Sequence, residues 1–277
     1  MYEINTDKVI KELKLAVISD LHYGSKTSEK YLKKVLDKVE NIRPTHIIMP
    51  GDIIDDDKKI RDINTFLSFL KELRKISKVI MSLGNHDISH FENDGWVSQN
   101  KYEYFNQIEK LDGVYVLNNE MISDKNHNVN FIGYTEPYEN YKYNNKKSLF
   151  LSDINDVLNL KLEEDSYNIL LAHNPTNFEN IKKSEVNILE NVDLIISGHM
   201  HAGLVPPYIR PIINKNVGII SPNKNFFPKK TTGKFKLEEI DHIIANPYTF
   251  LPENTKALRH FNKLYPRMID EVKIKSR

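Results

Sequence analysis

The chain has 277 residues, of which 40% are hydrophobic and 28% charged, and its formal net charge at pH 7 is +1. A chain of this length can bury a substantial core, and its near-neutral charge gives no electrostatic reason to expect bulk binding of nucleic acid. Cysteine is absent, which excludes disulfides and thiolate metal ligands and is compatible with a reducing compartment.

The sequence contains no apolar stretch of the length that a membrane span requires, about 18 residues. The N-terminal segment, MYEINTDKVIKEL, is charged throughout and lacks the apolar centre of a signal peptide. We therefore expect a cytoplasmic protein, and peripheral contact with a membrane stays open. No heptad pattern or apolar stripe indicates an oligomeric state.

The first third of the chain predicts strands that alternate with amphipathic helices. Short apolar runs predict strands at residues 13–19, 46–49 and 79–83. Ser28 is a suitable N-cap for a helix that ends near Ile42, because Pro44 prevents its continuation. Apolar residues at helical spacing predict a second helix from about Arg61 to Ile76.

The rest of the sequence, from residue 88 onward, indicates further strands on both sides of a Pro-rich segment. We expect a loop and then a helix at residues 88–110, an exposed loop at 136–147 and another helix at 149–160. Short apolar runs predict strands at 114–117, 129–133, 168–172, 193–197, 235–237 and 242–245. Residues 203–233 carry five prolines and are expected to form the rim of an active site. We see no internal repeat and expect one domain over 1–277.

Five of the apolar runs end in side chains that bind divalent metal: LAVISDLH, HIIMPGDIID, VIMSLGNHD, ILLAHNP and LIISGHMH. Such runs, separated by helices, predict an α/β fold with a largely parallel sheet. Because open α/β sheets bind ligands at the carboxyl ends of their strands, the five motifs should converge. One histidine at a strand end is more often structural, but five ordered motifs together favour a metal site.

The ordered motifs DLH, GDIID, GNHD, LAHNP and GHMH resemble the signature of the calcineurin-like metallophosphoesterases. The resemblance implies an α/β fold of four layers, an α/β/β/α sandwich, with the metal site at the carboxyl ends of the strands. It also implies two divalent metal ions and their ligands. The first ion would be held by Asp20, His22 and His201, the second by Asn85, His173 and His199, and Asp52 would bridge the two.

The resemblance further implies a phosphoesterase that cleaves a P–O bond by attack of a metal-bridging hydroxide. His86 corresponds to the histidine that protonates the leaving group, and Asp55 either orients that imidazole or is a solvated loop carboxylate. We expect Asp87 to order the loop by accepting hydrogen bonds. Manganese is the first expectation for the metal, with iron, zinc, cobalt and nickel as alternatives.

The chain is most similar to the small bacterial phosphodiesterase branch, so a small-molecule or lipid-linked phosphodiester is the expected substrate. The alternatives are a pyrophosphatase for a nucleotide-linked lipid or sugar, a nuclease, and a non-catalytic scaffold. A nuclease would need a basic groove that the charge does not indicate. A scaffold would have no need to keep the complete ligand set.

Other polar and aromatic residues carry weaker signals. Arg210 and Lys229–Lys230 could meet a second phosphate or an anionic lipid, or be solvated loop charges. Phe226 and Phe227 are expected to pack against the core, although a base or an acyl chain is an alternative. Glycines that precede candidate ligands are expected to allow sharp turns: Gly51, Gly84 and Gly198. Histidines without ligand spacing receive no chemical role: His46, His90, His127, His242 and His260.

Overall fold

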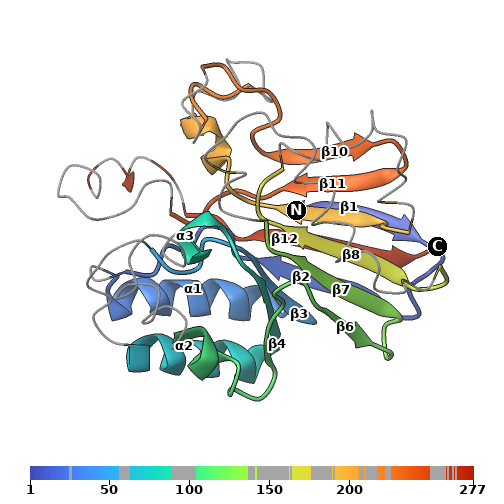
Figure 1. Ribbon diagram of the computed structural model, residues 1–277, viewed down its shortest axis with the longest axis horizontal. Coiled ribbons are helices and arrows are strands. Elements are labelled where there is room, and N and C mark those ends of the chain that lie inside the picture. Colours follow the sequence, from blue (N-terminus) through green and yellow to red (C-terminus); the bar gives the residue numbers. More distant parts are fainter. Residues whose placement is uncertain are drawn as a thin grey trace.

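The architecture is taken from a computed structural model. It describes residues 1–24, 27–55, 63–88, 104–136, 141, 162, 164–175, 189, 191–205, 209, 217–221, 226–249, 260, 262–263, 265 and 267–277. The described strands form two six-stranded mixed sheets that lie face to face (Figure 1). None of the helices in these ranges has the length and apolarity that a membrane crossing requires.

The first sheet joins the two ends of the chain. Its strands, in spatial order, are β1 (Tyr2–Thr6), β12 (Asp270–Ser276), β2 (Leu13–Val17), β3 (His46–Pro50), β4 (Lys78–Ser82) and β5 (Val114–Val116). Only the β12–β2 pair is antiparallel, and the other neighbours run parallel. The parallel β2–β3–β4 segment therefore directs three carboxyl ends to the same edge.

The second sheet contributes a parallel centre with one antiparallel pair at each side. Its strands, in spatial order, are β10 (Gly233–Leu237), β11 (Ile240–Ile244), β9 (Leu194–Ser197), β8 (Tyr167–Ala172), β7 (Val129–Tyr134) and β6 (Met121–Asp124). The β10–β11 and β6–β7 pairs are antiparallel hairpins, whereas β11, β9, β8 and β7 run parallel.

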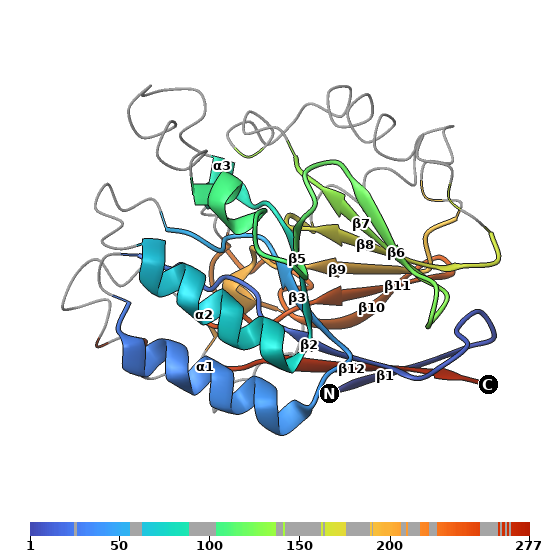
Figure 2. The same cartoon turned by 90° about the horizontal axis from the view of Figure 1, so that it is seen from below.

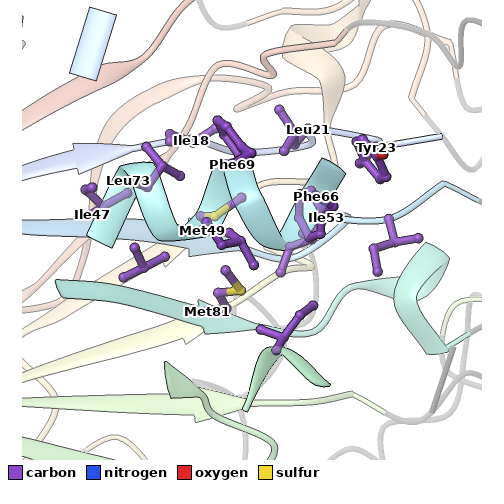
Figure 3. Close-up of a cluster of buried hydrophobic side chains, with 14 of the residues drawn as sticks. Ile18, Leu21, Tyr23, Ile47, Met49, Ile53, Phe66, Phe69, Leu73 and Met81 are labelled. Carbon is purple, nitrogen blue, oxygen red and sulfur yellow. The ribbon is translucent and has the colours of Figure 1, made fainter. Parts of the chain in front are cut away.

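Two helices cover the outer face of the first sheet, α1 (Glu29–Ile42) and α2 (Ile63–Ile76) (Figure 2). The side chain of Ser28 accepts a hydrogen bond from the amide of Tyr31 and caps α1, as the sequence predicts. Figure 3 shows Phe66, Phe69 and Leu73 of α2 packed against Ile47 and Met49 of β3. Their burial, rather than helix propensity alone, fixes the helix on the sheet.

Alternate residues of each central strand belong to different cores. In β3, Ile47 and Met49 face the helices while Ile48 faces the second sheet. In β8, Leu171 faces the first sheet and Leu170 faces outward into a third cluster, with Leu189 and Val192. Both sheets are thus covered on both faces, which explains why their strands are continuous apolar runs.

The predicted α/β sandwich is confirmed, but the expectation of one largely parallel sheet for the five motif-bearing strands is wrong. Three of these strands lie in the first sheet and two in the second. An apolar run buried on both faces looks the same in either sheet, so periodicity could not separate them. Three strands were missed, β1, β6 and β12, because each mixes charged or polar residues with its apolar ones.

Some predicted segments lie outside the described residues. They are most of the loop and the first part of the helix at 88–110, most of the loop at 136–147, the helix at 149–160, and parts of the Pro-rich segment at 203–233. The individual positions His90 and Arg210 also lie outside. The other predicted strands are confirmed to within two residues at each end. The described layers are therefore α1 and α2 followed by the two sheets.

Candidate metal centre

The five motifs meet where the carboxyl ends of β2, β3, β4, β8 and β9 converge from the two sheets. The short helix α3 (Asn85–Ile88) follows β4 and the 3-10 turn η1 (His201–Leu204) follows β9 (Figure 1). The structure thereby brings together eight of the residues that the sequence singled out: Asp20, His22, Asp52, Asp55, His86, His173, His199 and His201. Asn85 precedes His86 at the start of α3, and its Oδ1 is buried.

The backbone at this edge is strained at the candidate ligands. Five of them have positive φ, a region that residues with a side chain seldom adopt: Asp20 (52°), His22 (49°), Asp52 (50°), His199 (65°) and His201 (44°). Such strain is retained where the surrounding structure holds it in place, and it is often found at functional sites. Here it turns each chain sharply just past the end of its strand.

A first cluster consists of Asp20, His22, Asp52 and His201, whose ligand atoms lie within 4.8 Å of one another. Nε2 of His201 is 3.5 Å from Oδ1 of Asp20, and Nε2 of His22 is 3.9 Å from Oδ2 of Asp52. The rings of His22 and His201 are stacked with their centroids 5.4 Å apart. Two carboxylates and two imidazoles thus face one small space.

A second cluster consists of Asp52, His173 and His199 and shares Asp52 with the first. Nδ1 of His173 donates a 2.8 Å hydrogen bond to the carbonyl oxygen of Pro50, which leaves Nε2 facing the centre, 3.0 Å from Oδ2 of Asp52. A backbone carbonyl that fixes one ring nitrogen is the usual way in which a ligating histidine is oriented. Nothing in the sequence indicated this role of Pro50.

The predicted catalytic pair lies beside the first cluster. Nδ1 of His86 is 3.6 Å from Oδ1 of Asp55, and the ring of His86 meets that of His22 edge to face at 4.7 Å. Asp55 is 6% exposed, which contradicts its alternative as a solvated loop carboxylate. Its contact with both imidazoles fits a residue that positions a histidine.

Asp87 ties the β3 and β4 loops together. Its carboxylate accepts hydrogen bonds from the amides of Ile53 (3.0 Å), Ile54 (2.9 Å) and Gly84 (2.8 Å). The expected role as a loop-ordering acceptor is confirmed. These bonds hold Asp52 and Asn85, which lie on the two loops, at a fixed separation.

The histidines of the centre differ in the direction in which their pKa values are shifted. Burial, reinforced by neighbouring histidines, lowers the pKa of His22 and of His199 well below the usual value, so both rings are neutral. Burial would lower the pKa of His173 as well, but the carboxylate of Asp52 raises it to about 9. Burial alone would raise the pKa of Asp52, yet the surrounding histidines, His173 foremost, lower it well below its usual range.

The donor set fits divalent metal ions. Buried polar atoms of four candidate ligands have no hydrogen-bond partner among the described residues: both ring nitrogens of His22, Oδ1 of Asn85, Nε2 of His199 and Nδ1 of His201. Leaving such atoms unpaired costs about 1–3 kcal/mol each, unless a ligand satisfies them. Carboxylate, amide and neutral imidazole donors are those that first-row divalent ions accept.

The three glycines that precede candidate ligands allow the chain segments of the centre to pack closely. Only Gly51 has a positive φ (85°), as expected for a turn, and a Cβ there would lie 2.6 Å from Nδ1 of His173. Gly84 and Gly198 have no such φ, but their carbonyls accept hydrogen bonds from the amides of Asp87 (3.1 Å) and Met200 (2.7 Å), so the chain does turn at both, as expected. A Cβ at Gly84 would collide with Asp52, and one at Gly198 with Ser19, whose hydroxyl bonds to Asp20.

Tyr141 is a neighbour of the centre that the sequence did not indicate. Its ring lies 5.4 Å from that of His199. Of the predicted exposed loop at 136–147, the structure describes only Glu136, which is 2% exposed, and Tyr141, which is half-buried; the rest of that segment lies outside the described residues. The segment is rich in Tyr, Asn and Lys, a composition that gives no signal of burial.

A separate histidine group lies at the opposite ends of the strands. Nε2 of His46 and Nδ1 of His127 each lie 3.0 Å from Oδ2 of Asp124, and the ammonium of Lys78 is 3.9 Å from the same oxygen. Because Lys78 already supplies a positive charge there, the group is better suited to hydrogen bonding than to another cation.

The sequence model of the calcineurin-like phosphoesterase family matches residues 13–203. The chain belongs to this family. Members are metal-dependent phosphoric ester hydrolases, and the two His/Asp clusters that share Asp52 could hold metal ions. The family resemblance seen in the motifs is thereby confirmed.

Relatives among known proteins are distant. A protein of Helicobacter pylori described as an uncharacterized metallophosphoesterase is 28% identical over 206 residues, which cover 74% of this chain and 49% of that protein. UDP-2,3-diacylglucosamine pyrophosphatase LpxG of Chlamydia muridarum is 26% identical over 248 residues, which cover 76% of this chain and 71% of that protein. The chain spans about half the length of its Helicobacter and Campylobacter relatives.

Two solved structures illustrate the range of structural similarity. The protein TT1561 of Thermus thermophilus is 10% identical with a TM-score of 0.49, covering 94% of this chain and 97% of that one. The phosphopantetheinyl hydrolase PptH of Mycobacterium tuberculosis is 12% identical with a TM-score of 0.46, covering 90% of this chain and 95% of that one.

Proposed function

We propose that the chain is a dinuclear metal-dependent phosphoesterase that favours phosphodiesters over monoesters. The observation that carries the proposal is that Asp52 belongs to both clusters, so that one carboxylate can serve two ions. Each cluster also has ligands of its own: Asp20, His22 and His201 in the first, and His173 and His199 in the second, which supports two sites at a short separation. We propose residues 1–277 as one domain, since β12 pairs with both β1 and β2.

The proposed ligands divide between the two ions as follows. The first ion would be held by Asp20, His22 and His201, the second by Asn85, His173 and His199, and Asp52 would bridge them. When bound, the ions would make hydroxide available near neutral pH and neutralise charge on the phosphoryl oxygens. Manganese is the first candidate, with iron, zinc, cobalt and nickel as alternatives, because N and O donors suit all of them.

His86 is proposed to protonate the leaving-group oxygen. Its ring adjoins His22, and its backbone amide is bound to Asp52, so it lies at the edge of both clusters. Asp55 would position the ring through Nδ1. A proton donor of this kind contributes about a hundred- to ten-thousand-fold in rate, and it matters most for the poor alkoxide leaving group of a diester.

A pyrophosphatase for a nucleotide-linked lipid or sugar is the second candidate. It is favoured by the two Chlamydia relatives, both UDP-2,3-diacylglucosamine pyrophosphatases, at 26% and 23% identity. A UDP-linked acyl sugar added to the assays below tests it directly. Cleavage of that substrate in preference to simple diesters would replace the first proposal with the second.

The deciding experiment compares model substrates on one protein preparation. Metal-free protein should be inactive, Mn²⁺ should restore hydrolysis of bis(p-nitrophenyl) phosphate, and p-nitrophenyl phosphate should be cleaved more slowly. The reverse preference would overturn the phosphodiesterase assignment. Absence of turnover on every phosphoester, with metal bound, would favour a non-catalytic scaffold, and cleavage confined to DNA or RNA would favour a nuclease.

A further inference from the structure

The Pro-rich rim contains a short antiparallel hairpin, residues 217–221 and 226–230, here called the rim hairpin. Val217 pairs with Lys229 and Ile220 with Phe226, and the amide of Gly218 donates a 2.7 Å hydrogen bond to the carbonyl of Pro228. Figure 1 shows η1, the turn to which the hairpin is bonded, on the opposite side of the molecule from α1 and α2.

The rim hairpin is fixed to the turn that carries His201. The amide of Ile219 donates a 2.8 Å hydrogen bond to the carbonyl of Gly203. The backbones of Gly203 and Gly218 pack so closely that a Cβ on Gly218 would lie 2.6 Å from Cα of Gly203. The hairpin is therefore held in place beside the candidate metal centre.

The hairpin exposes large apolar side chains, which contradicts the expectation that Phe226 and Phe227 pack against the core. Phe226 is 73% exposed and Phe227 is 70% exposed, with their ring centroids 6.5 Å apart. Among the described residues only five large apolar side chains are exposed, and three of them, including Ile219, lie on this hairpin. Such a concentration on one protrusion marks an interaction surface.

The charge beside the rings indicates the kind of partner. Lys229 follows Phe227 and Pro228 and is exposed, and Lys230 comes next. Aromatic rings next to lysine suit a membrane interface, because the rings enter the boundary of the acyl chains while the ammonium groups stay at the anionic headgroups. A protein partner would need a matching pocket, whereas a bilayer accepts a convex protrusion as it is.

We propose that the rim hairpin docks the protein on anionic lipid bilayers, with Phe226 and Phe227 inserted at the interface and Lys229 on the headgroups. Docking through this element would place the turn that bears His201 next to the membrane surface. It would give the candidate metal centre access to phosphoesters whose acyl chains remain in the bilayer. The docking itself does not depend on the proposed catalytic activity.

Co-sedimentation with vesicles tests the proposal without turnover. Vesicles of phosphatidylcholine and phosphatidylglycerol in equal amounts are compared with vesicles of phosphatidylcholine alone. The parent protein should sediment with the anionic vesicles, and the double variant Phe226→Ser/Phe227→Ser should lower its partition coefficient by roughly tenfold or more. Lys229→Glu should lower it by at least about fivefold, and added salt should weaken parental binding.

Matched controls come from the opposite ends of the strands. Ile10 is 66% exposed and Lys11 is exposed, both between β1 and β2. Ile10→Ser and Lys11→Glu should sediment like the parent. Parental failure to bind anionic vesicles, or equal binding by the double Phe variant, would overturn the proposal. Self-association of the parent that the double variant abolishes, without vesicle binding, would assign the surface to a second copy instead.

Discussion

The backbone amide of His86 donates a 2.8 Å hydrogen bond to Oδ1 of Asp52. The bond joins the loop after β4 to the carboxylate that both clusters share. Because the donor is a backbone group, a substitution of the His86 side chain leaves the bond intact. The proposed metal-bridging and acid roles can therefore be separated by mutation.

Replacement of the shared carboxylate should abolish the dinuclear site. Asp52→Asn removes the charge that would bridge two cations, so we expect the affinity for at least one ion to fall by more than about a hundredfold. Metal content after reconstitution, measured by elemental analysis, checks this. Asp37→Asn, at an exposed position of α1, is the control. Two ions still bound to Asp52→Asn would contradict the assignment.

Replacement of His86 should affect catalysis without emptying the site. His86→Ala is expected to lower kcat on a diester with an alkyl leaving group by about a hundred- to ten-thousand-fold, and far less on a p-nitrophenyl diester. Metal content should stay at the parental level. Equal rates for variant and parent on the alkyl diester would remove the acid role.

Asp55 should act through that histidine. Asp55→Asn keeps the shape of the side chain but removes its charge 3.6 Å from Nδ1 of His86. We expect a smaller loss than for His86→Ala, together with a shifted pH–rate profile on the alkyl diester. In the double variant Asp55→Asn/His86→Ala, the Asp55 change should have no further effect. Additive losses would show that the two residues act independently.

Close packing at Gly84 should matter for metal binding. Gly84→Ala puts a methyl group against Asp52 and 2.9 Å from Cδ2 of His173, so we expect lowered metal content and about 1–3 kcal/mol less stability. Gly233→Ala is the matched control. A φ of 120° would strain alanine there, but the nearest atom beyond the adjacent residues, on Phe235, would be 3.7 Å from the new Cβ. The control should lose stability and keep its metal. Normal metal content in Gly84→Ala would refute the packing argument.

Acid should destabilise the metal-free protein through its buried histidines. Burial lowers the pKa of His46 to about 4 and that of His242 to about 3. Since the unfolded chain takes up these protons near pH 6.5, the unfolded state binds more protons below that pH. The contribution of these two neutral histidines to the free energy of unfolding is complete above pH 6.5. It declines as pH falls to about 4, by up to about 3 kcal/mol for His46.

Denaturant unfolding in the presence of EDTA checks the prediction between pH 7 and 4.5. His46→Gln should show a shallower decline of the free energy of unfolding than the parent over this range. His260→Gln, at an exposed position, should decline as the parent does. An identical slope for His46→Gln and the parent would show that His46 is protonated in the folded state.

The sequence by itself predicted which donor types gather at the candidate centre. Residue type is local information, and each of the five motifs stands directly after an apolar run, so the carboxyl ends of strands could be predicted to carry Asp, Asn and His. The N-cap at Ser28 and the helix that follows were equally local. By contrast, β12 was missed because its charged residues interrupt the apolar ones, so that it forms no apolar run, and because its partners, β1 and β2, lie at the far end of the chain.

The tertiary structure alone decided which strands share a sheet, that Pro50 orients the ring of His173, and that Phe226 and Phe227 face outward. The physical reason is that these features depend on pairings between residues remote in sequence. An apolar strand is compatible with either sheet, and an aromatic pair is equally compatible with a core and with a surface, until the rest of the chain supplies or withholds the neighbours.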